Sequence, residues 1–258
     1  MLTDARVSVL TCRRSTLVST HPLYELTVRL DDGAEIAAIG KVAPEREVRT
    51  YRHLVPGGRF GSPTVLGQSG GLLLLERVTG VPLWQCDLED WLVTAAEISR
   101  LHAKAAAGWC AAEDIGWWDR DPLARPAPEH LAGAAGVART VLAAAPRVVV
   151  HGETYPGNVL RRLDGRICLL DWESAAPGPA AIDLAALLTG WDAAGVREFR
   201  AAYDEAAPAP VSDAELAAAR LIWALRWLGA RQVLKPPSGS VDWASEARAA
   251  AEELRCVS

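Results

Sequence analysis

Hydrophobic and polar residues alternate in a series of short segments near the N-terminus, which is the pattern of half-buried β-strands. The segments predicted as strands are residues 7–11, 23–30, 35–42, 64–67 and 71–77. An Asp-Asp-Gly turn at residues 31–33 separates two of them. A helix is expected to begin near Pro44 and to carry Val48 and Tyr51 on one apolar stripe. The first eighty residues are therefore predicted to form a small β-sheet with one helix.

Beyond residue 80 the apolar residues recur at spacings of three and four, as they do on one face of a helix. The predicted helices cover residues 88–107, 128–145, 182–191, 194–206, 213–233 and 242–255. Ser212 and Glu215 have the spacing of a capping box at the start of one long helix. The chain is therefore predicted to be an α+β protein, β-rich over residues 1–80 and mainly helical over residues 81–258.

Two strand-like runs in the second half of the chain end in acidic and amide side chains. The apolar residues 148–150 lead into a polar loop that contains Glu153 and Asn158. The next apolar run, residues 167–170, is followed directly by Asp171. Oxygen ligands of this kind suit Mg²⁺, which binds through one or two protein groups together with substrate phosphates. The sequence therefore predicts a magnesium site where the two runs end.

The spacing of these residues is typical of phosphoryl-transfer enzymes of the kinase type. That chemistry uses an acid that faces the acceptor hydroxyl, an Asn five residues later on the metal, and an Asp from the next strand on the metal. Glu153, Asn158 and Asp171 have this spacing. Each piece alone is also compatible with an ordinary turn between strands, where Gly, Pro and Asn are common.

The whole pattern resembles the aminoglycoside phosphotransferase and choline kinase family of small-molecule kinases. Residues 151–160 read His-Gly-acid-x-x-x-Gly-Asn-Val-Leu, and residues 169–173 read Leu-Leu-Asp-Trp-Glu. The family has Asp where this chain has Glu153. The resemblance implies a protein-kinase-like two-lobe fold, with a small antiparallel β-sheet and one helix in the N-lobe (residues 1–80) and a mainly helical C-lobe (residues 81–258).

The resemblance also implies roles for the residues of the motif. Glu153 would orient and deprotonate the acceptor hydroxyl, and His151 would stabilise the loop through hydrogen bonds rather than transfer protons. Asn158 and Asp171 would hold Mg²⁺ between the phosphates. Glu173 is either a further oxygen ligand or a solvated loop acid.

Further roles fall outside the motif. By the same resemblance, Lys41 would contact the nucleotide phosphates and Glu47 would pair with it, although alone they read as ordinary surface charges. Glu76 and Val78 lie in the segment that would join the lobes and meet the adenine through its backbone. Asp183 would brace the catalytic loop, or else it is an acid placed by the helix dipole in a first helical turn.

The implied reaction transfers the terminal phosphate of ATP or GTP to a hydroxyl of a small molecule. Aminoglycoside-like, amino-alcohol and sugar-like acceptors head the candidates, so antibiotic resistance is one implied role. The alternative is a kinase-fold protein that binds a nucleotide or another ligand with little catalysis. Two features favour this alternative: the longer Glu153, and the absence of glycine from the loop at residues 12–22.

Two aromatic features remain open at the level of sequence. Trp109, Trp117 and Trp118 lie in an irregular segment, where they either form a wall of the substrate pocket or fill the core. His102 is interpreted as a packed or capping histidine rather than a catalytic one.

Composition narrows the partners and the location. A formal net charge of -5 argues against nucleic acid as the main partner. The chain lacks the roughly 18 consecutive apolar residues of a membrane helix, and no secretory signal is visible. Five scattered cysteines without metal spacing favour a reduced, cytoplasmic location. Lysines are rare beside the many arginines, which gives Lys41 more weight. The oligomeric state is left open.

Overall fold

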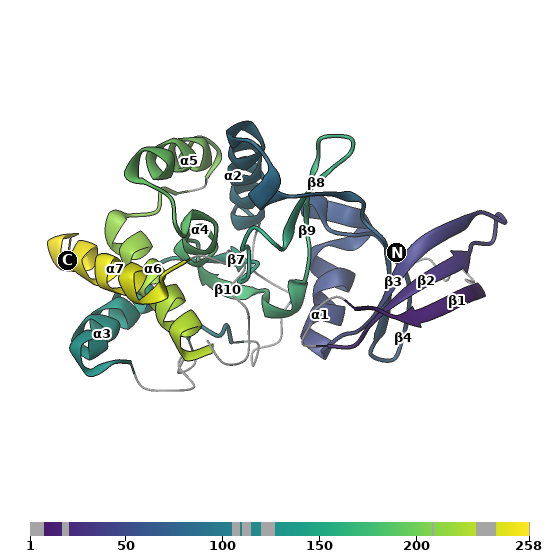
Figure 1. Cartoon of the computed structure of the whole chain (residues 1–258), viewed down its shortest axis with the longest axis horizontal. Coiled ribbons are helices and arrows are strands. Elements are labelled where there is room, and N and C mark those ends of the chain that lie inside the picture. Colours follow the sequence, from purple (N-terminus) through teal and green to yellow (C-terminus); the bar gives the residue numbers. More distant parts are fainter. Residues whose placement is uncertain are drawn as a thin grey trace.

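The computed structural model of the protein divides into a β-rich part and a helical part, which lie at opposite ends of the view in Figure 1. It describes residues 8–16, 21–104, 109, 115–119, 127–207, 209–230 and 241–257. The combination of a five-stranded antiparallel sheet with a helical part agrees with the predicted α+β, kinase-like fold. The division into two domains at residue 80 stays a prediction.

The N-terminal sheet is antiparallel throughout and has the strand order β1-β2-β3-β5-β4. Its strands are β1 (Ser8–Arg14), β2 (Leu23–Arg29), β3 (Glu35–Val42), β4 (Val65–Ser69) and β5 (Leu72–Glu76). Lys41 lies near the end of the central strand β3, opposite Leu23 on one side and Leu73 on the other. The sheet therefore places Lys41 at one end of its central strand, the end that faces the helical part.

One helix of the N-terminal part packs against the helical part. Helix α1 (Glu45–Arg49) continues into a wider π-helical turn, Thr50–Leu54, which closes with a hydrogen bond from Val55 N–H to Thr50 O. Val48, Tyr51 and Leu54 are buried, as the predicted stripe requires. Helix α1 contacts the short 3₁₀ turn Trp172–Ser174 of the helical part, which brings Glu47 close to the end of the second motif run.

Two smaller sheets carry the motif loop. The first has the strand order β6-β8-β9 and the second pairs β7 with β10, all antiparallel. Their strands are β6 (Gly80–Pro82), β7 (Arg147–Val150), β8 (Val159–Arg162), β9 (Ile167–Leu169) and β10 (Ala176–Pro179). The chain thus leaves the N-terminal sheet at Glu76 and, from Gly80, forms strand β6, which pairs with β8. The motif loop, residues 151–158, runs from β7 to β8.

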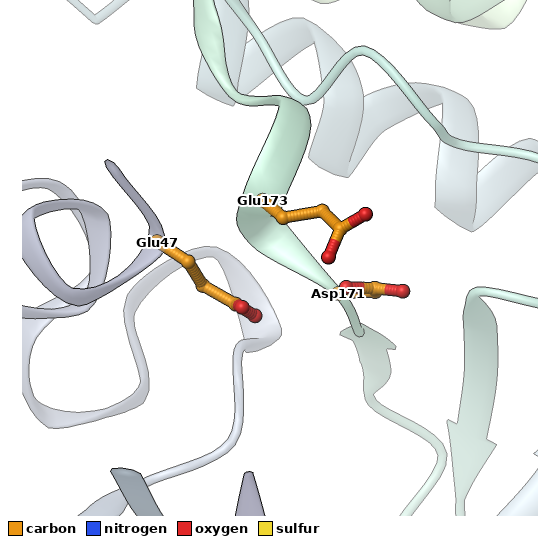
Figure 2. A group of neighbouring side chains, drawn as sticks. All are labelled: Glu47, Asp171 and Glu173. Carbon is orange, nitrogen blue, oxygen red and sulfur yellow. The ribbon is translucent and has the colours of Figure 1, made fainter. Parts of the chain in front are cut away.

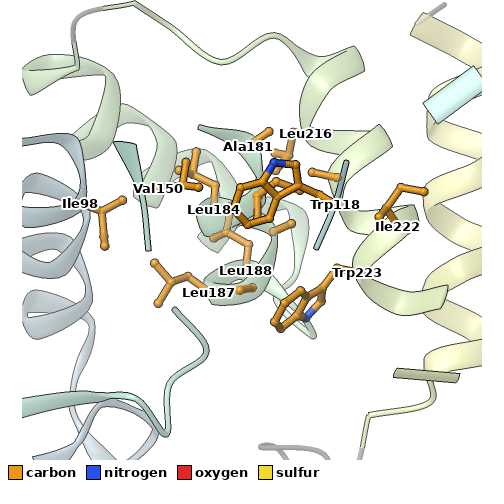
Figure 3. Packing of buried hydrophobic residues seen from close by; sticks show 14 of the residues in the cluster. Ile98, Trp118, Val150, Ala181, Leu184, Leu187, Leu188, Leu216, Ile222 and Trp223 are labelled. Atoms are coloured by element: carbon orange, nitrogen blue, oxygen red, sulfur yellow. The ribbon is translucent and has the colours of Figure 1, made fainter. Parts of the chain in front are cut away.

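Six helices in the described part of the chain build the second half of the fold: α2 (Leu88–His102), α3 (Glu129–Ala144), α4 (Ala181–Leu188), α5 (Ala193–Ala206), α6 (Asp213–Ala230) and α7 (Trp243–Val257). Every residue of α4 is buried, because this helix is apolar nearly all round and is enclosed by its neighbours. Figure 3 shows Leu184, Leu187 and Leu188 of α4 packed in the core with Trp118 and Trp223. No helix in the described residues combines the length and the apolar character that crossing a bilayer demands.

Two strands differ from the sequence prediction. Strand β1 continues to Arg14, which lies opposite Tyr24, so part of the segment expected as a loop at residues 12–22 is strand. Residues 17–20 of that segment lie outside the described residues. Strand β10 contains Pro177-Gly178-Pro179 and was not predicted, because proline is rare inside strands. It is tolerated here because β10 belongs to a two-stranded sheet and pairs with β7 alone.

Two helices end earlier than predicted within the described residues. Helix α2 stops at His102 rather than at residue 107, and Lys104 N–H bonds to Leu101 O in a tighter closing turn. Helix α4 ends at Leu188 rather than at residue 191. Helix α6 is described as far as Ala230, and its predicted end at residue 233 lies outside the described residues.

Helix α4 is expected to be essential for stability. The change Leu187→Ala should lower the free energy of unfolding by about 2–5 kcal/mol, because it leaves a cavity in a fully packed site. Leu163→Ala is the control, since Leu163 is 83% exposed and its truncation should change stability by less than about 0.5 kcal/mol. Chemical denaturation of both variants measures the difference, and equal effects would contradict the packing described for α4.

Candidate functional site

A buried carboxylate lies beneath the motif loop. Asp183, in the first turn of α4, accepts hydrogen bonds from the backbone N–H groups of His151 and Gly152, both at 2.8 Å. The Thr154 hydroxyl lies 3.2 Å from the same carboxylate and 2.8 Å from the Asp183 carbonyl oxygen. Since Asp183 is fully buried, these donors replace the water that a carboxylate would otherwise bind. The first half of the loop is thereby anchored to α4.

A histidine and a tyrosine complete the surroundings of Asp183. His102 Nε2 lies 3.0 Å from the Asp183 carboxylate, and His102 Nδ1 lies 2.7 Å from the Tyr203 hydroxyl. Burial acts to raise the pKa of Asp183, but the hydrogen bond and charge of His102, together with the backbone donor of His151, outweigh it and lower the pKa. Asp183 is therefore an anion at neutral pH, and His102 is a packed residue as interpreted from the sequence.

The ring of His151 stabilises the loop from inside. Its Nε2 donates to Leu170 O at 2.9 Å, and its Nδ1 accepts from Glu153 N–H at 3.3 Å. These partners assign the neutral tautomer with the proton on Nε2. Burial lowers the pKa of His151, although the neighbouring carboxylate of Asp183 opposes it. Because the ring is fully enclosed and both nitrogens are engaged, the contacts correspond to the loop-stabilising role predicted for it.

Gly152 has a backbone conformation that side chains rarely adopt, with φ of +83°. A Cβ at this position would lie 2.8 Å from the Trp118 ring and 2.9 Å from Ser174 O. Trp118 is buried in the core, whereas the neighbouring Trp117 donates its indole N–H to Gly152 O at 2.9 Å. Of the two interpretations of the tryptophan segment, filling the core therefore describes Trp118.

Asn158 joins the motif loop to the second motif run through its backbone. Its Nδ2 donates to Glu153 O at 3.0 Å, and its backbone carbonyl accepts from Leu170 N–H at 2.8 Å. The side-chain oxygen of Asn158 is left as a potential ligand. The bond to Leu170 brings Asn158 next to the residue that precedes Asp171.

Asp171 has a left-handed backbone, with φ of +64°. Asp tolerates this region better than most residues, and such conformations often mark functional sites. Its carboxylate forms an ion pair with Lys41 of β3. Lys41 Nζ also lies 2.8 Å from Glu47 and 3.5 Å from Glu173. Figure 2 shows the carboxylates of Glu47, Asp171 and Glu173 pointing toward a common space.

One ammonium is surrounded by three acids in this group. Burial acts to lower the pKa of Lys41, but attraction to Glu47 and Asp171 outweighs it and raises the pKa above its usual value. Burial raises the pKa of Glu47 to about 7, and Asp171 adds to this effect while Lys41 opposes it. Burial and Asp171 also raise the pKa of Glu173. The negative charge exceeds the positive charge, so the group favours a further cation.

A cleft of about 460 Å³ separates the N-terminal sheet from β8 and β9. Lys41, Glu47, Asn158 and Asp171 line it together. Its apolar lining includes Leu23, Ile39, Leu75, Leu160 and Leu170. Polar groups gathered at one part of a mainly apolar cleft are typical of a site for a small molecule with both a ring and charged groups.

The segment predicted to join the lobes also lines this cleft, through Glu76 and Val78. The Glu76 carboxylate is engaged, because it pairs with Arg162 at 2.5 Å and accepts from Thr64 N–H at 3.2 Å. Val78 forms no hydrogen bond with another described residue. The side chain of Glu76 is thus structural, while the backbone of this segment borders the cleft.

Glu153 does not line the cleft. Its carboxylate pairs instead with Arg226 of α6, with 2.5 Å between Oε1 and Nη2. Sequence reasoning missed Arg226. The signal that could have found it is a single charge inside the apolar run of residues 221–228. A charge in such a run requires a partner, but the sequence gives no indication that this partner is Glu153.

This arrangement defines the class: a kinase-like protein with a ligand cleft between a β-sheet and a helical part. The model of the phosphotransferase enzyme family matches residues 26–216, and the chain belongs to this family. No curated protein matches it by sequence.

Solved structures share the fold at low sequence identity. Choline kinase LicA from Streptococcus pneumoniae has a TM-score of 0.66 and 18% identity, covering 96% of this chain and 94% of its own. Macrolide 2′-phosphotransferase MphH from Brachybacterium faecium has a TM-score of 0.65 and 20% identity, covering 95% and 91%. A putative fructosamine-3-kinase from Thermobifida fusca has a TM-score of 0.61 and 20% identity, covering 99% and 97%. LicA has also been solved with AMP.

The loop geometry predicts a strong effect of a single methyl group. Gly152→Ala should lower the free energy of unfolding by about 1–3 kcal/mol or more, because the residue would be strained and would clash with Trp118. Gly133→Ala is the matched control, since Gly133 lies in α3 with open space around it. This variant should have a free energy of unfolding about 0.5–1 kcal/mol higher than the wild type. Denaturant titrations that gave both variants the same stability would contradict this geometry.

The enclosed ring of His151 predicts a pH dependence of stability. As pH falls below about 6.5, the unfolded chain takes up a proton on this residue before the folded chain does, so stability falls, by at most about 1.4 kcal/mol per pH unit. His151→Gln retains a donor and an acceptor but does not titrate. Unfolding measured between pH 7 and pH 5 should show a smaller slope for this variant, and identical slopes would contradict the assignment.

Proposed function

We propose that this chain transfers the terminal phosphate of ATP or GTP to a hydroxyl of a small molecule. The observation that carries the proposal is the convergence of Lys41, Asn158 and Asp171 on one cleft, from segments far apart in the sequence. Membership of the phosphotransferase family supports the reaction class. The proposed acceptors are sugar-like and amino-alcohol molecules, in keeping with relatives named for choline and macrolides.

The nucleotide is proposed to lie in the cleft between the sheet and β8. The segment that contains Glu76 and Val78 would meet the base through its backbone, and the apolar lining would cover the ring. Lys41, held by Glu47, would contact the phosphates as a compact cation. Phosphates would also relieve the close pairing of Lys41 with Asp171.

Asn158 and Asp171 are proposed to hold Mg²⁺. The donor set consists of hard oxygens, and the excess negative charge around Lys41 fits a divalent cation. When bound, the ion neutralises charge that develops on the phosphates. Glu173 lies beside Asp171 and is proposed to hold the Lys41 ammonium in position next to the metal ligands.

Glu153 is proposed to receive the proton of the acceptor hydroxyl. As the hydroxyl oxygen bonds to the terminal phosphorus, the bond from phosphorus to the bridging oxygen breaks, leaving a phosphate ester and the nucleoside diphosphate. Arg226 occupies one oxygen of the carboxylate, and the other has no hydrogen-bond partner among the described residues. Asp183 and His151 hold the loop that carries Glu153 in place.

A second candidate is a nucleotide- or ligand-binding protein with little catalysis. The ion pair between Glu153 and Arg226 favours it, because the carboxylate oxygen that Arg226 holds is not free to receive a proton. Under this alternative Mg-ATP raises the melting temperature of the protein while no acceptor is phosphorylated.

Substitution of the two proposed acids separates the candidates. Asp171→Ala should reduce phosphoryl transfer to the background level, and Glu153→Gln should lower kcat by about a hundredfold or more, because metal binding and proton acceptance are lost. Acceptor-dependent release of ADP and mass analysis of the product measure both. Glu89→Gln is the control, since Glu89 is exposed on α2. Full turnover in either of the first two variants would remove the proposed site.

A further inference from the structure

Arg226 is held in place beside the proposed base. Its Nη2 lies 2.5 Å from Glu153 Oε1, and its guanidinium lies over the Trp117 ring at 4.2 Å and within 5.5 Å of the Trp223 ring. Trp117 is in turn bonded to Gly152 O. The arginine is therefore in contact with the motif loop twice, directly and through the indole. Contacts with a carboxylate and with an aromatic face are the two that Arg makes better than Lys.

The remaining N–H groups of Arg226 have no partner among the described residues. Glu153 is its single hydrogen-bond acceptor there, and Nη1 is buried without any. The side chain nevertheless keeps 23% of its surface exposed. Through this exposed part the guanidinium can bind an anionic oxygen of a ligand beside Glu153.

The charge of Arg226 also bears on which acceptors can approach. An acceptor hydroxyl that reaches Glu153 must lie close to the guanidinium that is paired with the same carboxylate. An ammonium on a neighbouring carbon of the acceptor would then be repelled in a poorly solvated site, whereas a carboxylate or phosphate would be attracted. Glu153 balances one charge of Arg226, so the preference comes from the N–H donors of the guanidinium that are not bonded to Glu153: an anionic oxygen can accept from them and an ammonium cannot.

We propose that Arg226 positions the Glu153 carboxylate and selects acceptor alcohols that carry an anionic group near the hydroxyl. This inference rests on the proposed function, and it narrows the acceptor class away from amino alcohols. Arg226 acts on the proton transfer through Glu153, and on specificity through its own contact with the acceptor. The longer Glu at the position of the family Asp is accommodated because the guanidinium holds its end.

Four small acceptors of related size test the selection: glycerate, glycerol 3-phosphate, glycerol and 3-amino-1,2-propanediol. The wild type should use or bind the two anions at least about tenfold better than the ammonium compound, with glycerol between them. Comparison of the carboxylate with the phosphate identifies the preferred anion. Binding is measured by ligand-observed NMR and turnover by release of ADP. The absence of an anion preference in both measurements overturns the inference.

Three variants separate charge from positioning. Arg226→Gln keeps a donor without charge, and should raise KM for the anions and reduce the anion preference to within about threefold. Arg226→Lys keeps the charge without the planar fork, and should retain the preference while kcat falls by about tenfold or more for every acceptor. Arg197→Gln is the control, since Arg197 is exposed on α5 and should change neither quantity. An unchanged preference in Arg226→Gln overturns the specificity role.

The two proposals fail in different ways. If no acceptor is phosphorylated by the wild type, the proposed reaction fails, while an anion preference in binding that is lost in Arg226→Gln still supports the ligand class. If phosphorylation occurs and depends on Asp171 and Glu153 but favours ammonium alcohols, the reaction stands and the inference about Arg226 is wrong.

Discussion

The candidate site depends on one buried anion, the carboxylate of Asp183. Backbone donors of His151 and Gly152 and the ring of His102 converge on it, so a charge that would be unstable in the core becomes the fixed point of the motif loop. The loop reaches Asp183 only because Gly152 takes a left-handed conformation close to Trp118. The position of Glu153 therefore depends both on the packing of the core around Gly152 and on the hydrogen bonds of Asp183.

Charge is distributed unevenly on the two sides of this loop. Toward the N-terminal sheet, three acids surround Lys41 and leave an excess of negative charge. Toward the helices, Glu153 is paired with Arg226, whose guanidinium lies over the Trp117 ring and near the Trp223 ring. One side thus favours a cation that accompanies phosphates, and the other presents a guanidinium. The phosphoryl transfer proposed above would use this division, because the nucleotide and the acceptor would meet different charges.

Much of the fold could be predicted from the sequence because its signals are local. Alternation gives β2 and β3, and the motif residues stand at fixed distances along the chain. What escaped prediction depends on contacts between distant segments. Arg226 is 73 positions from Glu153 and is one of many arginines. Trp117 and Trp118 are adjacent in the sequence, yet Trp117 donates a hydrogen bond to the motif loop while Trp118 is buried in the core beside Gly152. The prolines at 177 and 179 argue against a strand, and β10 forms through its pairing with β7, a segment distant in the sequence.

The connection between the two parts of the chain is joined to the motif at two points. Directly after the N-terminal sheet ends, β6 pairs with β8, the strand that follows Asn158. Arg162 of β8 also pairs with Glu76, the last residue of β5. Any rotation of the sheet relative to the helices would therefore move β8, the strand that follows Asn158. Opening of the cleft would therefore displace the strand that follows Asn158, and with it the proposed metal ligand.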